Sequence, residues 1–168
     1  MQESSFTFEY DVPALEEFQE RMRSIMAEYP YLVCEDEMGR VQGYAYAHRA
    51  QERAAYGWNA ELSVYLDKNC RGKGMGTRFY EALMRILRLQ NVQNLYALIA
   101  SPNEKSEALH EKMGFTCSGR YTKTGFKAGA WHDVLLYEKM IGGHECPPSK
   151  FLPFPQIPEE AIQEILES

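Results

Sequence analysis

The chain has 168 residues, a length typical of one domain, and 45% of them are hydrophobic, enough for a buried core. Its formal net charge of −6 argues against binding to nucleic acid or a membrane surface, and no apolar run approaches the roughly 20 residues of a membrane span. The four cysteines form no CxxC pair, so we expect neither a disulfide framework nor a bound metal. Because the chain starts without a signal-peptide pattern, these features predict a soluble cytoplasmic protein.

The first part of the chain predicts a strand followed by a helix. Aromatic and β-branched residues at 6–10 favour a short strand. Over residues 12–29, apolar side chains recur every three or four positions and define one helical face. Pro13 suits the first turn of this helix, and Pro30 ends it.

Three strands are predicted next. Residues 31–37 and 41–48 flank a turn at Gly39, which indicates a hairpin. Residues 49–59 mix charges and aromatic rings without a clear period, which is typical of a loop. Residues 60–66 then form another run that predicts a strand.

The second half of the chain alternates between helices and strands. Residues 77–90 have the period of a helix, and residues 94–100 are nearly all apolar, which predicts a central strand covered on both faces. Two further strands are expected at 115–125 and 130–141, joined through residues 126–129.

Residues 101–115 carry the clearest helix signals in the chain. Ser101 can cap the helix, Pro102 suits its first position, and Glu104 completes a capping box. Gly114 suits the left-handed residue that follows the end of a helix.

This order of elements predicts an α/β fold of the α+β type. The sheet is expected to be mixed and mostly antiparallel, flanked by helices, with one strand–helix–strand crossover in the middle. After Gly143 the composition changes. Five prolines at 144–158 predict an extended segment, and residues 159–168 a short acidic helix. We therefore expect one domain over 1–143 and an extension over 144–168.

A glycine-rich turn lies between the strand at 60–66 and the helix at 77–90, where residues 71–76 read R-G-K-G-M-G. The start of a helix offers unpaired N–H groups and the positive end of its dipole, and glycines let a phosphate approach the backbone closely. The turn is therefore a candidate pyrophosphate site, although an ordinary strand-to-helix turn has the same pattern. The spacing matches neither GxxxxGK[ST] nor GxGxxG.

This motif resembles the Arg/Gln-x-x-Gly-x-Gly/Ala signature of the GCN5-related N-acetyltransferases. The stretch SPNEKSEALHEKMGF at 101–115 resembles the second half of the family pattern, an Asn-containing helix start that leads into a Gly-Phe strand. Over residues 6–140, the runs YPYLVCE, GYAYAHRAQERAAYGWNAELSVYL and GFKAGAWHDVLLYE resemble the phosphinothricin and methionine sulfoximine N-acetyltransferases. The resemblance implies acetyl-coenzyme A as co-substrate and a homodimer.

The resemblance also implies where acetyl-coenzyme A binds. The backbone of Val64, Tyr65 and Leu66 would pair with its pantetheine arm, and Asn103 would reach that arm from the other side. The pyrophosphate would lie on Arg71, Gly72, Lys73, Gly74, Met75, Gly76 and Thr77.

Members of the family usually have one more strand and helix before the segment that matches the start of this chain. The resemblance therefore implies that these first elements are missing: either the sequence is short at this end, or the Pro-rich extension or a partner subunit fills their place. Their absence puts activity in question more than fold.

Acetylation of an amine requires a group that removes a proton from the ammonium form. Glu61 matches the acidic position of the subfamily pattern WxxExSVYV and is the predicted general base; the alternative is a surface carboxylate at the end of a strand. His132, in WHDV, matches a histidine proposed for proton relay. Its alternative is a half-buried strand histidine bonded to Asp133 or to the backbone.

The resemblance places the amino-acid substrate near Arg53, Tyr56, Ser63 and Lys127, whose cations would clamp a carboxylate. Both cations can instead be solvated loop charges. We expect an N-acetyltransferase for a small amino acid or analogue. Two alternatives stay open: an enzyme for protein N-termini or lysines, and a non-catalytic acyl-coenzyme A-binding module.

Overall fold

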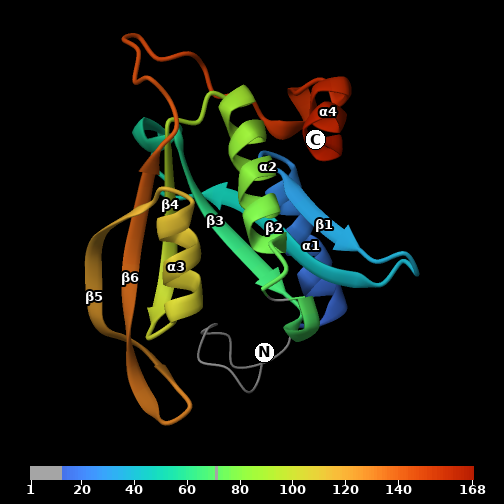
Figure 1. Cartoon of the computed structure of the whole chain (residues 1–168). Helices are drawn as coiled ribbons and strands as arrows, with labels where there is room; N and C mark the ends of the chain where they lie inside the picture. The colour runs from blue at the N-terminus through green and yellow to red at the C-terminus, as the bar shows by residue number, and fades with distance from the viewer. Residues whose placement is uncertain (1–12, 71) are drawn as a thin grey trace.

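The computed structural model describes residues 13–70 and 72–168, which form a six-stranded sheet with helices on both faces (Figure 1). The strand order is β1-β2-β3-β4-β6-β5, and only β3 and β4 are parallel. The strands are β1 (Tyr31–Glu35), β2 (Val41–Arg49), β3 (Asn59–Leu66), β4 (Asn94–Ser101), β5 (Thr116–Lys127) and β6 (Ala130–Met140). The helices are α1 (Leu15–Met26), α2 (Met75–Leu89), α3 (Glu104–Lys112) and α4 (Glu159–Glu167), with 3₁₀ turns η1 (Ala54–Tyr56), η2 (Lys68–Cys70) and η3 (Phe154–Gln156). The predicted fold class is confirmed.

The core lies between α2 and the sheet, where large helix side chains meet small strand side chains. Leu83 and Leu87 of α2 are fully buried against Ala45, Ala47 and Ala60. Alanines on the strands let the helix approach closely, and each buried leucine stabilises the fold by about 1.5–3 kcal/mol. This face of the sheet is therefore the rigid one.

The opposite face of the sheet is covered by α1 and is more open. Side chains alternate along β2, so Tyr44 and Tyr46 point away from the alanines and toward α1. The ring of Phe18 in α1 meets Tyr44 edge-on, with centroids 6.1 Å apart. None of the α1 residues is buried, so this helix covers its face only partly.

Strands β3 and β4 pair over a short distance and then separate. Their parallel register runs only from Asn59–Asn94 to Glu61–Tyr96. Beyond Glu61, β3 continues to pair with β2, and β4 continues to pair with β6. Figure 1 shows the two strands diverging toward their carboxyl ends. Residues 62–66 of β3 and 97–101 of β4 do not pair with each other, and we call these two facing edges the splay. Glu61 lies at its apex.

The C-terminal extension is tied to the domain. The side-chain amide of buried Gln90 donates to the carbonyls of Leu152 (2.8 Å) and Glu28 (2.7 Å), so it links the extension to the ends of α1 and α2. The Trp58 indole donates to the Ser149 carbonyl at 2.7 Å. These contacts lie at the end of α2 opposite the glycine turn, so they leave the turn uncovered.

Several local predictions are corrected by the structure. Ser101 belongs to β4 and does not cap α3; the cap is Asn103, whose Oδ1 accepts from the Ser106 amide at 3.3 Å. Pro102 precedes the helix, which begins at Glu104. Strand β5 extends to Lys127, so the turn before β6 is shorter than expected. For Ser101 and for the end of β5, strand pairing in the sheet overrides the local turn signals.

Other predictions are confirmed or fall outside the described residues. Gly114 has the expected left-handed φ of +80° directly after α3. The strand expected at 6–10 and the position of Arg71 lie outside the described ranges. Within the described ranges, none of the helices is both long enough and apolar enough to cross a membrane.

Candidate active site

The glycine turn opens α2 in a conformation that exposes its first N–H groups. Gly72 and Gly74 have φ values of +76° and +81°, and Gly74 is the residue before the helix. A β-carbon at either glycine would meet no atom within 4 Å, so both face open space. The first turn of α2 carries no acidic side chain, which leaves the positive end of the helix dipole uncompensated. The backbone therefore suits a phosphate group.

A second cation lies at this turn that the sequence did not indicate. The Lys112 ammonium, at the end of α3, donates to the Thr77 hydroxyl at 3.4 Å. Gly76 makes this approach of α3 possible, because a β-carbon there would lie 3.0 Å from the Leu109 side chain. Lys73 in the turn is exposed. Positive charge is thus gathered on both sides of the candidate pyrophosphate site.

Val64, Tyr65 and Leu66 form the β3 edge of the splay. These residues pair with β2 on one side, and β3 and β4 are no longer paired at this level on the other. In a strand, N–H and C=O groups alternate between the two edges, so part of this backbone is directed toward the splay. Asn103 lies on the other side of the splay, shortly after β4. Its Oδ1 accepts from the Ser106 amide in the helix cap, and this bond fixes the orientation of its side-chain amide nitrogen. The pantetheine contacts of these residues stay a prediction.

Glu61 occupies the apex of the splay and is mostly buried. Its side chain is 20% exposed, and its Oε1 lies 3.7 Å from Nε2 of His48 in the neighbouring strand β2. Burial raises the pKa of the Glu61 carboxyl, and the charge of His48 lowers it by a smaller amount. A carboxylate with a raised pKa is a stronger base than a solvated one. The alternative of a freely solvated carboxylate does not describe this residue.

His48 is a site residue that the sequence analysis did not identify. Tyr44, Tyr46 and His48 alternate along β2, and the antiparallel register places them opposite Tyr65, Ser63 and Glu61 of β3. Only the hairpin register, which the sequence does not specify, identifies this pairing.

A buried pair of side chains joins the two helices on the opposite face. His110 Nδ1 lies 2.7 Å from the Ser106 carbonyl, which can only accept, so the histidine donates there and its Nε2 accepts from the Tyr80 hydroxyl. Burial lowers the pKa of His110, which favours the neutral form that this pattern needs. Burial, followed by the charge of Glu61, raises the pKa of Tyr80. The pair therefore fixes α2 against α3 close to the apex.

The other predicted site residues fall into two groups. Ser63 lies on the same face of β3 as Glu61, and Arg53 and Tyr56 lie in the exposed loop that leads into β3. His132 and Lys127 lie together in the β5–β6 hairpin, where His132 Nε2 is 3.0 Å from the Lys127 carbonyl.

His132 and Glu61 are not brought together within the described chain. Glu61 pairs with Tyr96, which pairs with Glu138, and His132 lies six positions further along β6. At about 3.3 Å per residue, this places the two side chains roughly 20 Å apart along the strands. The hairpin group therefore lies near the open end of the splay, whereas Glu61 lies at its apex.

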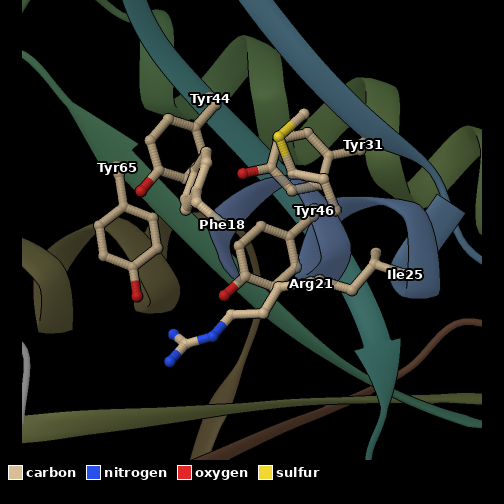
Figure 2. Close-up of a pocket in the computed structure, with 8 residues that line it drawn as sticks. Phe18, Arg21, Ile25, Tyr31, Tyr44, Tyr46 and Tyr65 are labelled. Atoms are coloured by element: carbon tan, nitrogen blue, oxygen red, sulfur yellow. The ribbon is translucent and has the colours of Figure 1, made fainter. Parts of the chain in front are cut away.

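A pocket on the α1 face is lined by a row of aromatic rings (Figure 2). Tyr31 and Tyr46 stack at 5.1 Å, and Tyr44 and Tyr65 stack at 5.0 Å. In Figure 2 the hydroxyls of Tyr46 and Tyr65 point to the side of the pocket where Arg21 lies. The row leads along β2 and β3 toward Glu61, so it forms an aromatic wall beside the candidate base.

A family model described as "Acetyltransferase (GNAT) domain" matches residues 1–136 of the chain. The phosphinothricin N-acetyltransferase of Streptomyces viridochromogenes is 33% identical over 136 residues, which is 81% of this chain and 74% of that protein. The L-methionine sulfoximine/L-methionine sulfone acetyltransferase of Pseudomonas paraeruginosa is 37% identical over 110 residues, 66% of this chain and 64% of that protein. The chain thus spans less than two thirds of the second relative.

Among solved structures, the chain is similar to a phosphinothricin acetyltransferase of the GNAT superfamily from Sinorhizobium meliloti, determined in complex with acetyl-coenzyme A. The TM-score is 0.82 with 33% sequence identity, and the alignment covers 88% of this chain and 80% of that one. The chain belongs to the GNAT acetyltransferase family.

Proposed function

We propose that this protein transfers the acetyl group of acetyl-coenzyme A to the amine of a small amino acid or amino-acid analogue. The substrate type is that of phosphinothricin and methionine sulfoximine, on which the similar enzymes act by name. The observation that carries the proposal is the end of β3–β4 pairing at Glu61 and Tyr96. It leaves a β3 edge that does not pair with β4, between a helix start suited to phosphate and a partly buried carboxylate.

The co-substrate would lie along this edge. Its pyrophosphate would be held at residues 71–77, and its pantetheine arm would pair with the backbone of Val64 to Leu66, with Asn103 opposite. The thioester would then lie near the apex. Gly72 and Gly74 leave the backbone of the turn open to phosphate oxygens, and Lys112 adds positive charge.

The chemistry at the apex follows from the position of Glu61. An ammonium group must lose a proton before its nitrogen can attack the thioester carbonyl. Glu61 takes that proton, the new C–N bond forms, and the C–S bond breaks to release the thiolate. Nitrogen loses two protons in total: one goes to the thiolate and the other leaves with solvent.

The acceptor would approach from the α1 face, where Ser63 and the tyrosine row adjoin Glu61. Arg53 and Tyr56 remain the proposed contacts for its carboxylate, together with Lys127 from the hairpin. His132 lies at the hairpin end of the splay, so the proposed proton relay by His132 requires that the acceptor, or a second subunit, extends to that end. We also propose that the protein acts as a cytoplasmic homodimer, and light scattering in solution tests its oligomeric state.

The test is a thiol-release assay with acetyl-coenzyme A and a panel of amines. The panel contains phosphinothricin, methionine sulfoximine, methionine sulfone, the common amino acids and short peptides. We expect turnover with an amino-acid analogue and none with peptides. Binding of acetyl-coenzyme A without turnover of any amine would favour a non-catalytic binding module.

Acetylation of peptides is the second candidate, and one structural observation favours it. Within the described residues, a groove that opens to solvent lies between α1 and β2, with Ser24, Tyr46 and His48 among its lining residues. An open groove can admit an extended chain, whereas a closed pocket cannot. A competition experiment separates the two candidate functions. Free amino acids inhibit the turnover of a peptide only if both acceptors bind in the same closed subsite.

A further inference from the structure

His48 has a defined tautomer in this structure. Its Nδ1 lies 3.1 Å from the carbonyl oxygen of the next residue, Arg49. A carbonyl oxygen only accepts hydrogen bonds, so Nδ1 carries the hydrogen. The other ring nitrogen, Nε2, is then the one that gains or loses a proton. It faces Oε1 of Glu61 at 3.7 Å.

A single proton between the two side chains makes this contact favourable. With the hydrogen on Nδ1, a neutral His48 presents a lone pair to Glu61, and an ionised carboxylate also presents lone pairs. The contact is favourable when one proton resides on the pair, either as imidazolium and carboxylate or as imidazole and carboxylic acid. His48 and Glu61 can therefore take up one proton together at the apex of the splay.

His48 also connects Glu61 to water. The His48 side chain is 34% exposed, compared with 20% for Glu61. It lines an open groove between α1 and β2, whose other lining residues are Glu17, Glu20, Arg21, Ser24, Ile25 and Tyr46. A proton on His48 can thus leave to solvent, whereas the carboxyl of Glu61 lies deeper.

The charged groups around the pair are largely compensated among themselves. On α1, Glu17 pairs with Arg21, and Glu20 pairs with Arg23. Beside His48, Arg49 donates to the Glu28 carboxylate at 2.7 Å. Glu61 pairs in register with Tyr96 of β4, and its charge contributes to the raised pKa of Tyr80 in α2. Among these neighbours, His48 is the group that Glu61 faces as an ion-pair partner.

We infer that His48 accepts the proton that Glu61 removes from the acceptor amine and passes it to water in the α1–β2 groove. The inference rests on the proposed function. In each turnover, the ammonium proton goes to a Glu61 oxygen, then to Nε2 of His48, and then to water or buffer, which restores the free base. His48 acts through Glu61, so it is a positioning and relay residue. The family resemblance predicts the relay role for His132, but its side chain lies roughly 20 Å from that of Glu61 along the strands.

The first test is the pH dependence of kcat/KM for His48→Gln, with His144→Gln as the matched control. His144 is an exposed histidine that bonds Asn94. If both Glu61 and His48 must be unprotonated, log kcat/KM of the parent rises on the acid limb with a slope approaching two, and that of His48→Gln with a slope of one. We also expect kcat of His48→Gln to fall about 10- to 100-fold, with the affinity for acetyl-coenzyme A unchanged.

The second test is chemical rescue. His48→Ala opens the groove, and free imidazole can then take the proton in place of the missing side chain. We expect imidazole to restore part of the lost kcat in His48→Ala and to leave Glu61→Ala unaffected. A uniform loss at all pH values without rescue would mean that His48 only supports the fold, and this result would overturn the inference.

A third measurement separates the inference from the proposed function. Long-range ¹H–¹⁵N correlation spectra report the tautomer of each of the four histidines without any substrate. We expect His48 to carry its hydrogen on Nδ1, and its Nε2 signal in Glu61→Gln to differ from that in the parent. Turnover of no amine by the parent would refute the proposed function. Identical Nε2 signals in the two proteins would overturn the inference about His48, whether or not the parent is active.

Discussion

The two faces of the sheet differ in how completely their residues are held. On the α2 face, leucines are buried against alanines, and the Tyr80–His110 pair locks α2 to α3. On the α1 face, stacked tyrosines, Glu61 and His48 border an open groove beneath a helix without buried residues. Under the proposed function, the α2 face would hold the coenzyme turn in position, and the α1 face would receive the acceptor and release the proton.

The largest expected effect is on coenzyme binding at the rigid end. Gly74→Asp places a carboxylate at the proposed pyrophosphate site and a side chain at a φ of +81°, so we expect the affinity for acetyl-coenzyme A to fall below detection by calorimetry. Gly39→Asp is the matched control. Gly39 has a φ of +73° in the β1–β2 turn and equally open surroundings. Equal affinities in the two variants would contradict the phosphate assignment.

The next effect isolates chemistry on the open face. Glu61→Gln removes the base but keeps the shape of the side chain, so we expect kcat to fall about 100-fold or more while coenzyme affinity stays within about twofold. Glu35→Gln, at the exposed end of β1, serves as the control and keeps full activity. Steady-state kinetics and calorimetry measure the two quantities, and unchanged kcat would remove Glu61 as the base.

Truncating a leucine should cost more stability on the α2 face than on the α1 face. Leu83 of α2 is fully buried and Leu15 of α1 is 71% exposed. Leu83→Ala should destabilise the protein by about 2–5 kcal/mol, because it leaves a cavity in the core. Leu15→Ala should change stability by less than about 0.5 kcal/mol. Urea denaturation measures both values, and similar losses would show that α1 is packed as tightly as α2.

A smaller effect is expected where the extension is attached. Trp58→Phe removes the donor to the Ser149 carbonyl and should cost about 1 kcal/mol, the usual net value of one hydrogen bond. Trp131→Phe, at a ring that is 61% exposed, is the comparison and should cost less than about 0.5 kcal/mol. If the two variants unfold at the same urea concentration, the extension contributes little through this bond.

The smallest effect concerns pH. Burial raises the pKa of Glu61 in the folded protein, with a smaller opposing effect from His48, so the folded state holds this proton more tightly than the unfolded state. Ionisation of Glu61 therefore costs stability as the pH rises from the ordinary glutamate range through the raised pKa. The difference in Tm between Glu61→Gln and the parent should therefore be more positive at about pH 7 than at about pH 4. A difference in Tm that is constant with pH would mean that burial does not act on this carboxyl.

Much of the fold followed from local patterns in the sequence. The helical period at 77–90, the apolar run at 94–100 and the glycine at position 114 each predicted the element found there. The cap of α3 was misassigned because Ser101 and Asn103 are both good caps, and only the pairing of Ser101 with Asp133 places it in β4. Local signals were ambiguous where a sheet partner decided the outcome.

The site was predictable only in part for the same reason. The glycine turn and Glu61 lie in contiguous motifs, so sequence could identify them. His48 faces Glu61 through strand register, and Lys112 reaches Thr77 through helix packing. Neither relation has a signature in the sequence. The family pattern also joined Glu61 and His132, which the strands of one chain keep far apart.

The most direct test of the central claim is amide hydrogen exchange with and without acetyl-coenzyme A. The claim is that the coenzyme fills the splay and the glycine turn. We expect slower exchange at residues 62–66 of β3 and at 72–77, and no change in α4 at the far end of α2. Protection confined to other segments, or none at 62–66 and 72–77 when binding is saturated, would contradict the account.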